Sequence, residues 1–432
     1  MFHFIIFIMH NTLKSIILSS ILACYAVMGV AQQANVFEQM KANPMKSYGN
    51  DCPYPFDEAS LTKAPSGYKA FYISHYARHG SRYYWNDKLY AELDTLLTIA
   101  HNNQQLTAVG KEFYKKFMDA KDELTIGVSE LTQLGWEQHQ KNARIMYNNF
   151  PEVFKNGGNV FANSSLVGRC VMSMSAFCQE LVQCNPKIEI REMSSRFTLD
   201  AVVPSDEQNP IKHSFPKPRP RYEKNIAKFQ SNDALRGDII KRVFTSTDGL
   251  PGNLHHIGSN LLHLYTSLPN IAHEGMMDGI VTNDEMVQMW ERSNLGSYSW
   301  VFGLQYETIP ILQDIIKKAD EVIAGSRDMV ADLRFGHDSY IGPLTVLMGI
   351  NGADRDPEDP AEVKNCYQNF ETCMACNIQL IFYQGKKTSD EILVKCLLNG
   401  KEAHLPVQTD AFPYYRWNDL RKFYLARCNE VK

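Results

Sequence analysis

Short apolar runs alternate with amphipathic helical patterns along most of this chain. The first run, Lys69–Tyr76, is dense in aromatic and β-branched residues, which is typical of a buried strand. Apolar residues at helical spacing follow it, and Pro151 ends the last of these helices. Further strands are predicted at Val160–Asn163, Lys187–Arg191, Val330–Phe335, Asn377–Tyr383 and Ile392–Leu398. This order predicts an α/β fold: an α/β core with a central mixed sheet, plus an inserted, mainly helical domain.

A proline-rich segment separates the strand-containing patterns from a long helical block. Residues 204–220 carry five prolines, so this segment is neither one helix nor a central strand. Residues 222–325 look helical and contain no convincing strand. The predicted organisation is a signal peptide at 1–31, an N-terminal extension at 32–66, a first core part at 67–203, a helical insertion domain at 204–326 and a second core part at 327–432.

The composition excludes several classes of protein. The 432 residues are 44% hydrophobic and 21% charged, which rules out a disordered chain, a collagen and a coiled coil. The 44 Lys and Arg residues nearly balance the 48 Asp and Glu residues, giving a net charge of −4. A chain with this balance is not built to coat nucleic acid or an anionic membrane. A local basic pocket for an anionic substrate remains compatible with it.

The N-terminus has the pattern of an export signal. Ile16–Val30 is mostly apolar, and Gly29–Ala31 is a small-residue cleavage site before Gln32. Loss of residues 1–31 would remove Lys14 and change the net charge to −5. We therefore expect a periplasmic or secreted protein. A retained N-terminal anchor and a lipid anchor on Cys24 are the alternatives.

Ten cysteines are present, and export would permit disulfides between them. Cys373 and Cys376 form a CxxC motif, with Cys366 and Cys396 nearby. The cysteines fit disulfides, buried thiols or a zinc site, although the outer spacings are irregular for zinc.

Polar side chains stand at the ends of three predicted strands. Arg78, His79 and Arg82 follow the first, Arg169 follows the second, and His337 with Asp338 follows a later one. Ligands of open α/β sheets bind at the carboxyl ends of strands, so these segments could meet at one point. Taken alone, each has an ordinary structural role available, such as a solvated turn or a helix cap.

Together these side chains fit the hydrolysis of a phosphate monoester. Each guanidinium offers a planar fork of donors to the phosphoryl oxygens. A neutral imidazole can attack phosphorus and form a phosphohistidine. An acid must then protonate the leaving alkoxide, and Asp338 is the available acid.

The motifs resemble those of histidine acid phosphatases (histidine phosphatase superfamily, branch 2). Residues 78–82, Arg-His-Gly-Ser-Arg, match the RHGxR signature, and residues 131–138 resemble its LTxxGxxQ segment. Residues 164–177 resemble the helix of the third arginine, and Gly336–Asp338 resembles the HD motif. The resemblance spans roughly residues 67–425. Within the family, the run from Arg169 to Phe177 looks most like multiple inositol polyphosphate phosphatases and phytases.

The resemblance implies a role for each site residue. His79 would be the nucleophile and Asp338 the proton donor, and the phosphate-binding residues would be Arg78, Arg82, Arg169 and His337. It also implies an α/β core with a helical domain inserted after the third arginine. Two positions depart from the narrower group: Tyr84 stands where phytases often have proline, and His337-Asp338-Ser339 replaces the His-Ala-Glu usual in the inositol phosphatases.

We expect a small-molecule phosphate monoester as substrate, with inositol polyphosphate as the more specific candidate. No cofactor, metal, nucleic acid or stable protein partner is implied. The histidines at 255, 256, 263 and 273 lack a nearby carboxylate pair with metal-ligand spacing. A basic stretch, residues 212–224, is either a solvated loop or a rim that attracts polyphosphorylated substrates. The alternative functions are a phosphoglycerate-mutase-like phosphotransferase and a catalytically silent phosphate-ester-binding protein.

Overall fold

The computed structural model describes residues 35–56, 60–228, 233–387 and 391–431, which divide between two units, one ending at Pro44 and one beginning at Met45. The described part of the first unit contains helix α2 (Val36–Ala42), whose first turn is capped by the Asn35 side chain. The predicted signal peptide and Cys24 lie outside the described residues. Within the described ranges, no helix is both long and apolar enough to cross a membrane.

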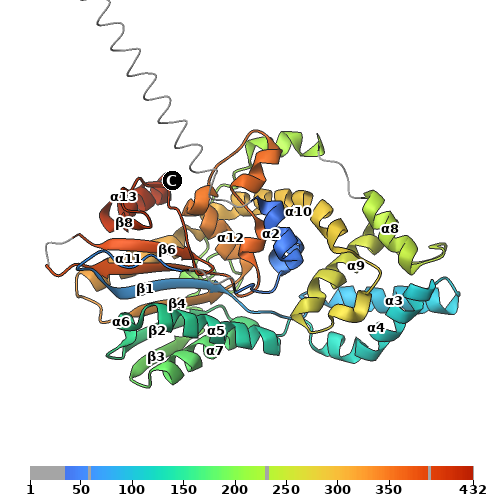
Figure 1. The fold of residues 1–432 in the computed structure, drawn as a ribbon, viewed down its shortest axis with the longest axis horizontal. Coiled ribbons are helices and arrows are strands. Elements are labelled where there is room, and N and C mark those ends of the chain that lie inside the picture. Colours follow the sequence, from blue (N-terminus) through green and yellow to red (C-terminus); the bar gives the residue numbers. More distant parts are fainter. Residues whose placement is uncertain (1–34, 57–59, 229–232, 388–390, 432) are drawn as a thin grey trace, which may run out of the picture. The chain divides into compact units, whose positions relative to one another are not determined.

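A mixed sheet forms the centre of the second unit (Figure 1). Its strands are β1 (Lys69–Arg78), β2 (Gly158–Ser164), β3 (Ile188–Met193), β4 (Ala331–Gly336), β5 (Asn377–Gln384), β6 (Leu393–Leu398), β7 (Lys401–Glu402) and β8 (Tyr414–Arg416). Their order is β3-β2-β4-β1-β5-β6-β7, with β8 also paired to β6. The first four strands in this order are parallel, and the others are antiparallel. The predicted fold class is confirmed, and the short strands β7 and β8 were not predicted.

Helices cover both faces of this sheet (Figure 1). Tyr72 and Tyr76 of β1 point into one apolar core, which contains residues of α11 (Ile309–Ile323), α12 (Asp338–Leu347) and α13 (Trp417–Asn429). Ile73 and Ala77 point into the other core, which contains residues of α5 (Gln133–Asn149), α6 (Pro151–Phe154) and α7 (Gly168–Cys184). Because side chains alternate along a strand, β1 is buried on both faces and reads as a continuous apolar run.

A third apolar core lies between helices alone. It joins α3 (Asp87–Asn102) and α4 (Ala108–Ile126) to α8 (Asp233–Val243) and α9 (Leu254–Ser267). Helix α10 (Asn283–Leu304) adds Met286 and Met289 to this core, and its C-terminal half belongs to a smaller fourth core together with Val346 of α12. Residues 233–323 are thus mainly helical, as expected, but α3 and α4 from the first core part share their apolar core. The predicted domain boundaries stay a prediction.

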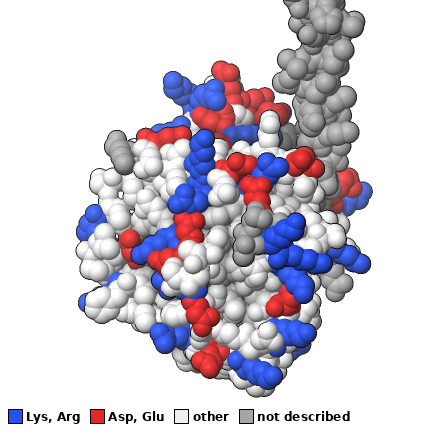
Figure 2. All heavy atoms as spheres, turned by 90° about the vertical axis from the view of Figure 1, so that its left-hand side faces the viewer, with Lys and Arg blue, Asp and Glu red and all other residues white. Residues whose placement is uncertain are grey.

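The face of the molecule in Figure 2 carries lysine and arginine side chains interspersed with aspartate and glutamate. No large patch of one sign dominates this face.

Four basic residues of the 212–224 stretch are held by nearby acceptors: Lys212 by the Glu207 carbonyl, Lys217 by Glu307, Arg219 by Glu223 and Arg221 by Asp356. These contacts favour the solvated-loop interpretation of that stretch over a substrate-attracting rim.

Candidate active site

Three adjacent parallel strands bring the predicted site residues to one edge of the sheet. Strand β4 lies between β2 and β1, and Arg78 at the end of β1 is in register with Gly336 at the end of β4. Ser164 at the end of β2 is in register with Phe335. The segments that follow these strands therefore start side by side. They carry His79 after β1, Arg169 in the first turn of α7, and His337 just before α12.

His79 is buried, and its ring has a defined tautomer. Its Nδ1 lies 2.9 Å from the carbonyl oxygen of Gly80. A carbonyl only accepts hydrogen bonds, so the Nδ1 atom carries the proton and the Nε2 atom keeps its lone pair. Burial, followed by the charges of Arg78 and Arg169, holds the pKa of His79 well below its usual value. The imidazole is therefore neutral over most of the pH range, as a nucleophile must be.

Three guanidinium groups surround this imidazole. Arg78 is fully buried and donates to the carbonyl oxygens of Thr372 (2.9 Å) and Asn50. Arg169 donates to the Ser129 hydroxyl at 2.7 Å, and Arg82 donates to the carbonyl of Tyr83 at 3.1 Å. The Nε atoms of all three arginines have no hydrogen-bond partner within the protein. The cluster thus holds donors and positive charge that a bound anion can use.

His337 and Asp338 complete the group at the start of α12. His337 is neutral, because burial and then Arg169 lower its pKa to about 3. Its Nδ1 accepts from Arg169 (3.4 Å), so its Nε2 donates to Ser165 (3.1 Å). The ring centroids of His79 and His337 are 5.6 Å apart.

Asp338 forms contacts through both carboxylate oxygens. Its Oδ1 accepts from the backbone N–H of Ser339 (3.0 Å), and its Oδ2 accepts from Asn50 (2.8 Å) and lies 3.2 Å from Arg78. Burial alone would raise the pKa of Asp338, but the charges of Arg78 and Arg82 outweigh it and lower the pKa below the usual value. The carboxyl group is thus ionised when the site is empty of substrate.

Two helices begin at the site without side-chain caps. Neither Val167, the N-cap of α7, nor His337, the N-cap of α12, makes a capping side-chain hydrogen bond. Both helices therefore direct the positive ends of their dipoles at the site, although the Ser339 N–H in the first turn of α12 already donates to Asp338. Together with the three arginines, these features suit a phosphoryl group.

The loop after β1 is held by the segment that resembles LTxxGxxQ. The backbone N–H of Ser81 donates to Gln138, and the Ser81 carbonyl accepts from the backbone of Thr132. Gly80 packs directly on Gly135: a Cβ on Gly80 would lie 2.3 Å from the Gly135 carbonyl oxygen. Both glycines are needed for this close approach, which fixes the position of the loop backbone that carries His79 and Arg82.

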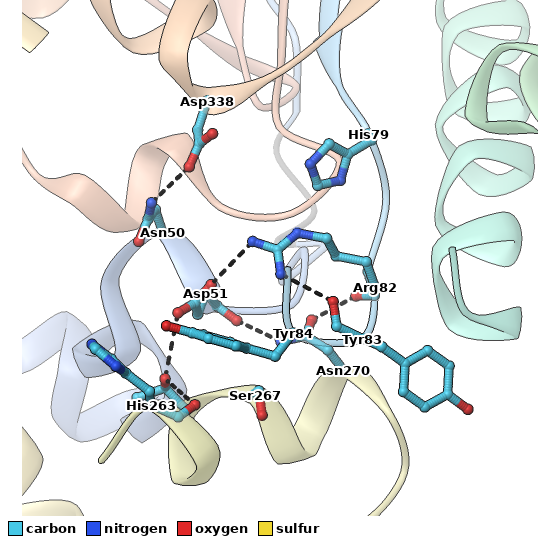
Figure 3. A network of polar contacts seen from close by, with 12 residues as sticks. Asn50, Asp51, His79, Arg82, Tyr83, Tyr84, His263, Ser267, Asn270 and Asp338 are labelled. Atoms are coloured by element: carbon cyan, nitrogen blue, oxygen red, sulfur yellow. Dashed lines mark hydrogen bonds and ion pairs between the residues drawn. The ribbon is translucent and has the colours of Figure 1, made fainter. Parts of the chain in front are cut away.

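The N-terminal extension also reaches the site, which sequence reasoning did not predict. Asn50 and Asp51 lie at the end of the 3₁₀ helix η1 (Pro44–Asp51), and Asp51 is 4.0 Å from Arg82 (Figure 3). Asn270 links this segment to the loop, because it donates to the Asp51 carbonyl and accepts from Ser81. The polar, turn-rich composition around residue 50 gave no signal for this placement.

The nine cysteines of the described residues are present as thiols, and all except Cys184 are buried. Of the three possibilities left open by the sequence, the buried-thiol interpretation fits the structure. In the part of the chain that the structure describes, no group of three or more potential ligands could hold a metal ion. His256 instead contacts Glu92, and His273 contacts Glu123.

Comparison with known proteins finds a family model that matches part of this chain. Residues 76–237 match the model of the histidine phosphatase superfamily (branch 2); the match includes Arg78, His79, Arg82 and Arg169 and ends before His337. No curated protein matches the chain. Recognition of the family and of a phosphatase enzyme is confirmed, whereas the roles of single residues stay predictions.

Solved structures share the fold. The multiple inositol polyphosphate phosphatase of Bifidobacterium longum, in complex with inositol hexasulfate, has a TM-score of 0.67 at 18% identity, over 89% of this chain and 98% of that one. The same enzyme in complex with phosphate gives the same values. The phytase of D. castellii has a TM-score of 0.65 at 16% identity, over 90% of this chain and 86% of that one.

Proposed function

We propose that this chain, whose residues 76–237 match the model of the histidine phosphatase superfamily (branch 2), is an exported phosphomonoesterase that acts through a phosphohistidine at His79. The observation that carries the proposal is the state of His79. Its Nδ1–H is engaged by the Gly80 carbonyl, its Nε2 lone pair is available, and three arginines surround it.

In the first step, His79 Nε2 attacks phosphorus and the bond from phosphorus to the ester oxygen breaks. Arg78, Arg82 and Arg169 hold the phosphoryl oxygens and balance their charge. The departing alkoxide takes the proton of the Asp338 carboxyl group and leaves as an alcohol. The low pKa of Asp338 in the empty site does not prevent this, because the bound phosphate engages Arg78 and its negative charge favours the protonated carboxyl group.

In the second step, water attacks the phosphohistidine. The Asp338 carboxylate takes a proton from this water, the phosphorus–nitrogen bond breaks, and inorganic phosphate leaves. His79 returns to its starting tautomer, since its Nδ1–H stays bonded to Gly80 throughout. His337 is neutral and adds no charge to the site, and it orients Arg169 through the 3.4 Å contact between its Nδ1 and the guanidinium.

We also propose inositol polyphosphates as the substrate class. The proposal is supported by the run from Arg169 to Phe177 and by the likeness in fold to an inositol polyphosphate phosphatase and a phytase. The test is a panel of phosphate release by the purified protein from phytate, glycerol phosphate, nucleotides and nitrophenyl phosphate. Phytate as the substrate with the highest kcat/KM supports this class, and a preference for a single-phosphate ester contradicts it. The absence of turnover on every ester would favour a catalytically silent binding protein.

Export is tested separately from activity. The full chain, produced in a bacterial host, is expected in the periplasmic or secreted fraction with Gln32 as its first residue. A cytoplasmic product that retains residues 1–31 would contradict export.

A further inference from the structure

Asn50 contacts the proton donor of the proposed reaction from the far end of the chain. Its side-chain Nδ2 donates to Asp338 Oδ2 at 2.8 Å, across 288 positions of sequence (Figure 3). Its backbone carbonyl accepts from Nη1 of Arg78. One residue of the N-terminal extension therefore contacts both members of the Arg78–Asp338 ion pair.

The backbone around Asn50 is fixed from several sides. Asn270 donates to the Asp51 carbonyl at 2.7 Å, and the backbone N–H of Met374 donates to the Cys52 carbonyl at 3.0 Å. Gly49 has a φ of 62°, and a Cβ there would lie 2.5 Å from Asn369 Nδ2. Glycine at position 49 allows this turn, and the two hydrogen bonds to the backbone that follows it hold Asn50 in place.

Both carboxylate oxygens of Asp338 therefore have hydrogen-bond partners in the protein. Oδ1 faces the Ser339 N–H at the start of α12, and Oδ2 faces the Asn50 amide and Arg78. We propose that Asn50 is a positioning residue, which orients the Asp338 carboxyl group and limits the pH range in which that group can donate a proton. This inference rests on the proposed function.

The direction of the pH effect follows from the groups that face Asp338. The titratable and charged groups around it are Arg78, Arg82, Arg169, Cys170, His337, Tyr367 and Cys376. The hydrogen bond from Asn50 stabilises the ionised carboxylate. Loss of that bond raises the pKa of Asp338. The acid form then persists to higher pH, so the alkaline limb of the rate profile moves upward.

The test compares Asn50→Ala and Asn50→Asp with the wild-type protein over pH, using glycerol phosphate and nitrophenyl phosphate. Both variants should move the alkaline limb of kcat/KM for glycerol phosphate to higher pH, and Asn50→Asp should move it further because two facing carboxyl groups share a proton. At the acid optimum, Asn50→Ala should lose about tenfold in kcat on glycerol phosphate, the order expected for one charge-assisted hydrogen bond. The loss on nitrophenyl phosphate should be smaller, since its leaving group needs little protonation.

Asn159→Ala is the matched control. Asn159 donates to Asp328 at 2.9 Å through the same kind of bond, but it lies at the amino end of β2, away from the site. This variant should leave both limbs of the profile unchanged.

The outcomes separate this inference from the proposed function. A wild-type protein without turnover refutes the proposed function and the inference with it. An active wild type whose alkaline limb does not move in either Asn50 variant, with equal losses on both substrates, refutes the inference alone. A ¹³C carboxyl titration of aspartate-labelled protein, with Asp338 assigned through Asp338→Asn, checks the shift without turnover. An unchanged midpoint in Asn50→Ala would also overturn the inference.

Discussion

Replacement of Arg169 by lysine separates the charge of this side chain from its shape. The Arg169 guanidinium donates to Ser129 at 2.7 Å and to His337 at 3.4 Å, and its Nε has no partner within the protein. A lysine ammonium is a single point charge that cannot reach a phosphoryl group while it holds both neighbours. The variant keeps the positive charge and loses at least one charge-assisted hydrogen bond to the phosphoryl group.

The loss should be large for a conservative change. Hydrogen bonds to charged groups contribute roughly 1.5–3 kcal/mol each, so the loss of one or two lowers transition-state stabilisation by about 3 kcal/mol. This energy corresponds to a fall of about a hundredfold in kcat/KM. Both KM and kcat should change, because these donors hold the phosphoryl group in the ground state and hold it more strongly in the transition state.

The assay is steady-state turnover of glycerol phosphate and nitrophenyl phosphate at the pH optimum, with the melting temperature as a check of folding. Arg144→Lys is the matched control, since Arg144 is exposed on α5 and pairs with the buried Glu180 of α7. That variant should turn over like the wild type. A folded Arg169→Lys protein within about twofold of wild-type kcat/KM would refute the phosphate-clamp role and leave Arg169 with its contact to Ser129.

Three further predictions concern pH, the proton donor and metal ions. The kcat/KM profile should be bell-shaped with its optimum below neutrality, because His79 must be neutral, Asp338 must be protonated and the pKa values of both groups are lowered. An optimum above pH 7, where a carboxyl group with a lowered pKa is ionised, would contradict these assignments. Asp338→Asn should lose far more kcat on glycerol phosphate than on nitrophenyl phosphate, measured with phosphorylation as the rate-limiting step, and equal losses would show that another group protonates the leaving group. Activity should survive prolonged EDTA treatment and vanadate should inhibit, since three arginines already supply the positive charge; loss of activity that one divalent ion restores would overturn this expectation.

The central part of the site could be predicted from the sequence because its residues lie next to strands that local apolar patterns indicate. Arg78 and His79 lie at the end of a strand whose apolar run is long and unambiguous, and Gly336 and His337 lie at the end of another. Parallel strands share one edge for their carboxyl ends, so the polar residues after them had to meet once the strands were neighbours. The strand β8, with three residues, carries too little pattern to be recognised.

The contacts that the sequence could not predict join segments without a shared pattern. Asn50 reaches Asp338 through a 3₁₀ turn and the positive φ of Gly49, and neither periodicity nor spacing reports such a contact. Helical spacing likewise indicates that α3 and α8 each have an apolar face, but it does not indicate that these faces share one core. Tertiary packing determines both the contact between Asn50 and Asp338 and the core that α3 and α8 share.

The most direct test of the account is to locate the phosphoryl group during turnover. Protein and ³²P-labelled nitrophenyl phosphate are mixed at acid pH and quenched within milliseconds in alkaline denaturant, in which phosphohistidine persists, and the labelled peptide is then mapped. Label is expected on Nε2 of His79 in the wild type, and more of it in Asp338→Asn because water attack lacks its base. Folded His79→Ala should carry no label and should also lack turnover. Label on another residue, or wild-type turnover in His79→Ala, would contradict the account.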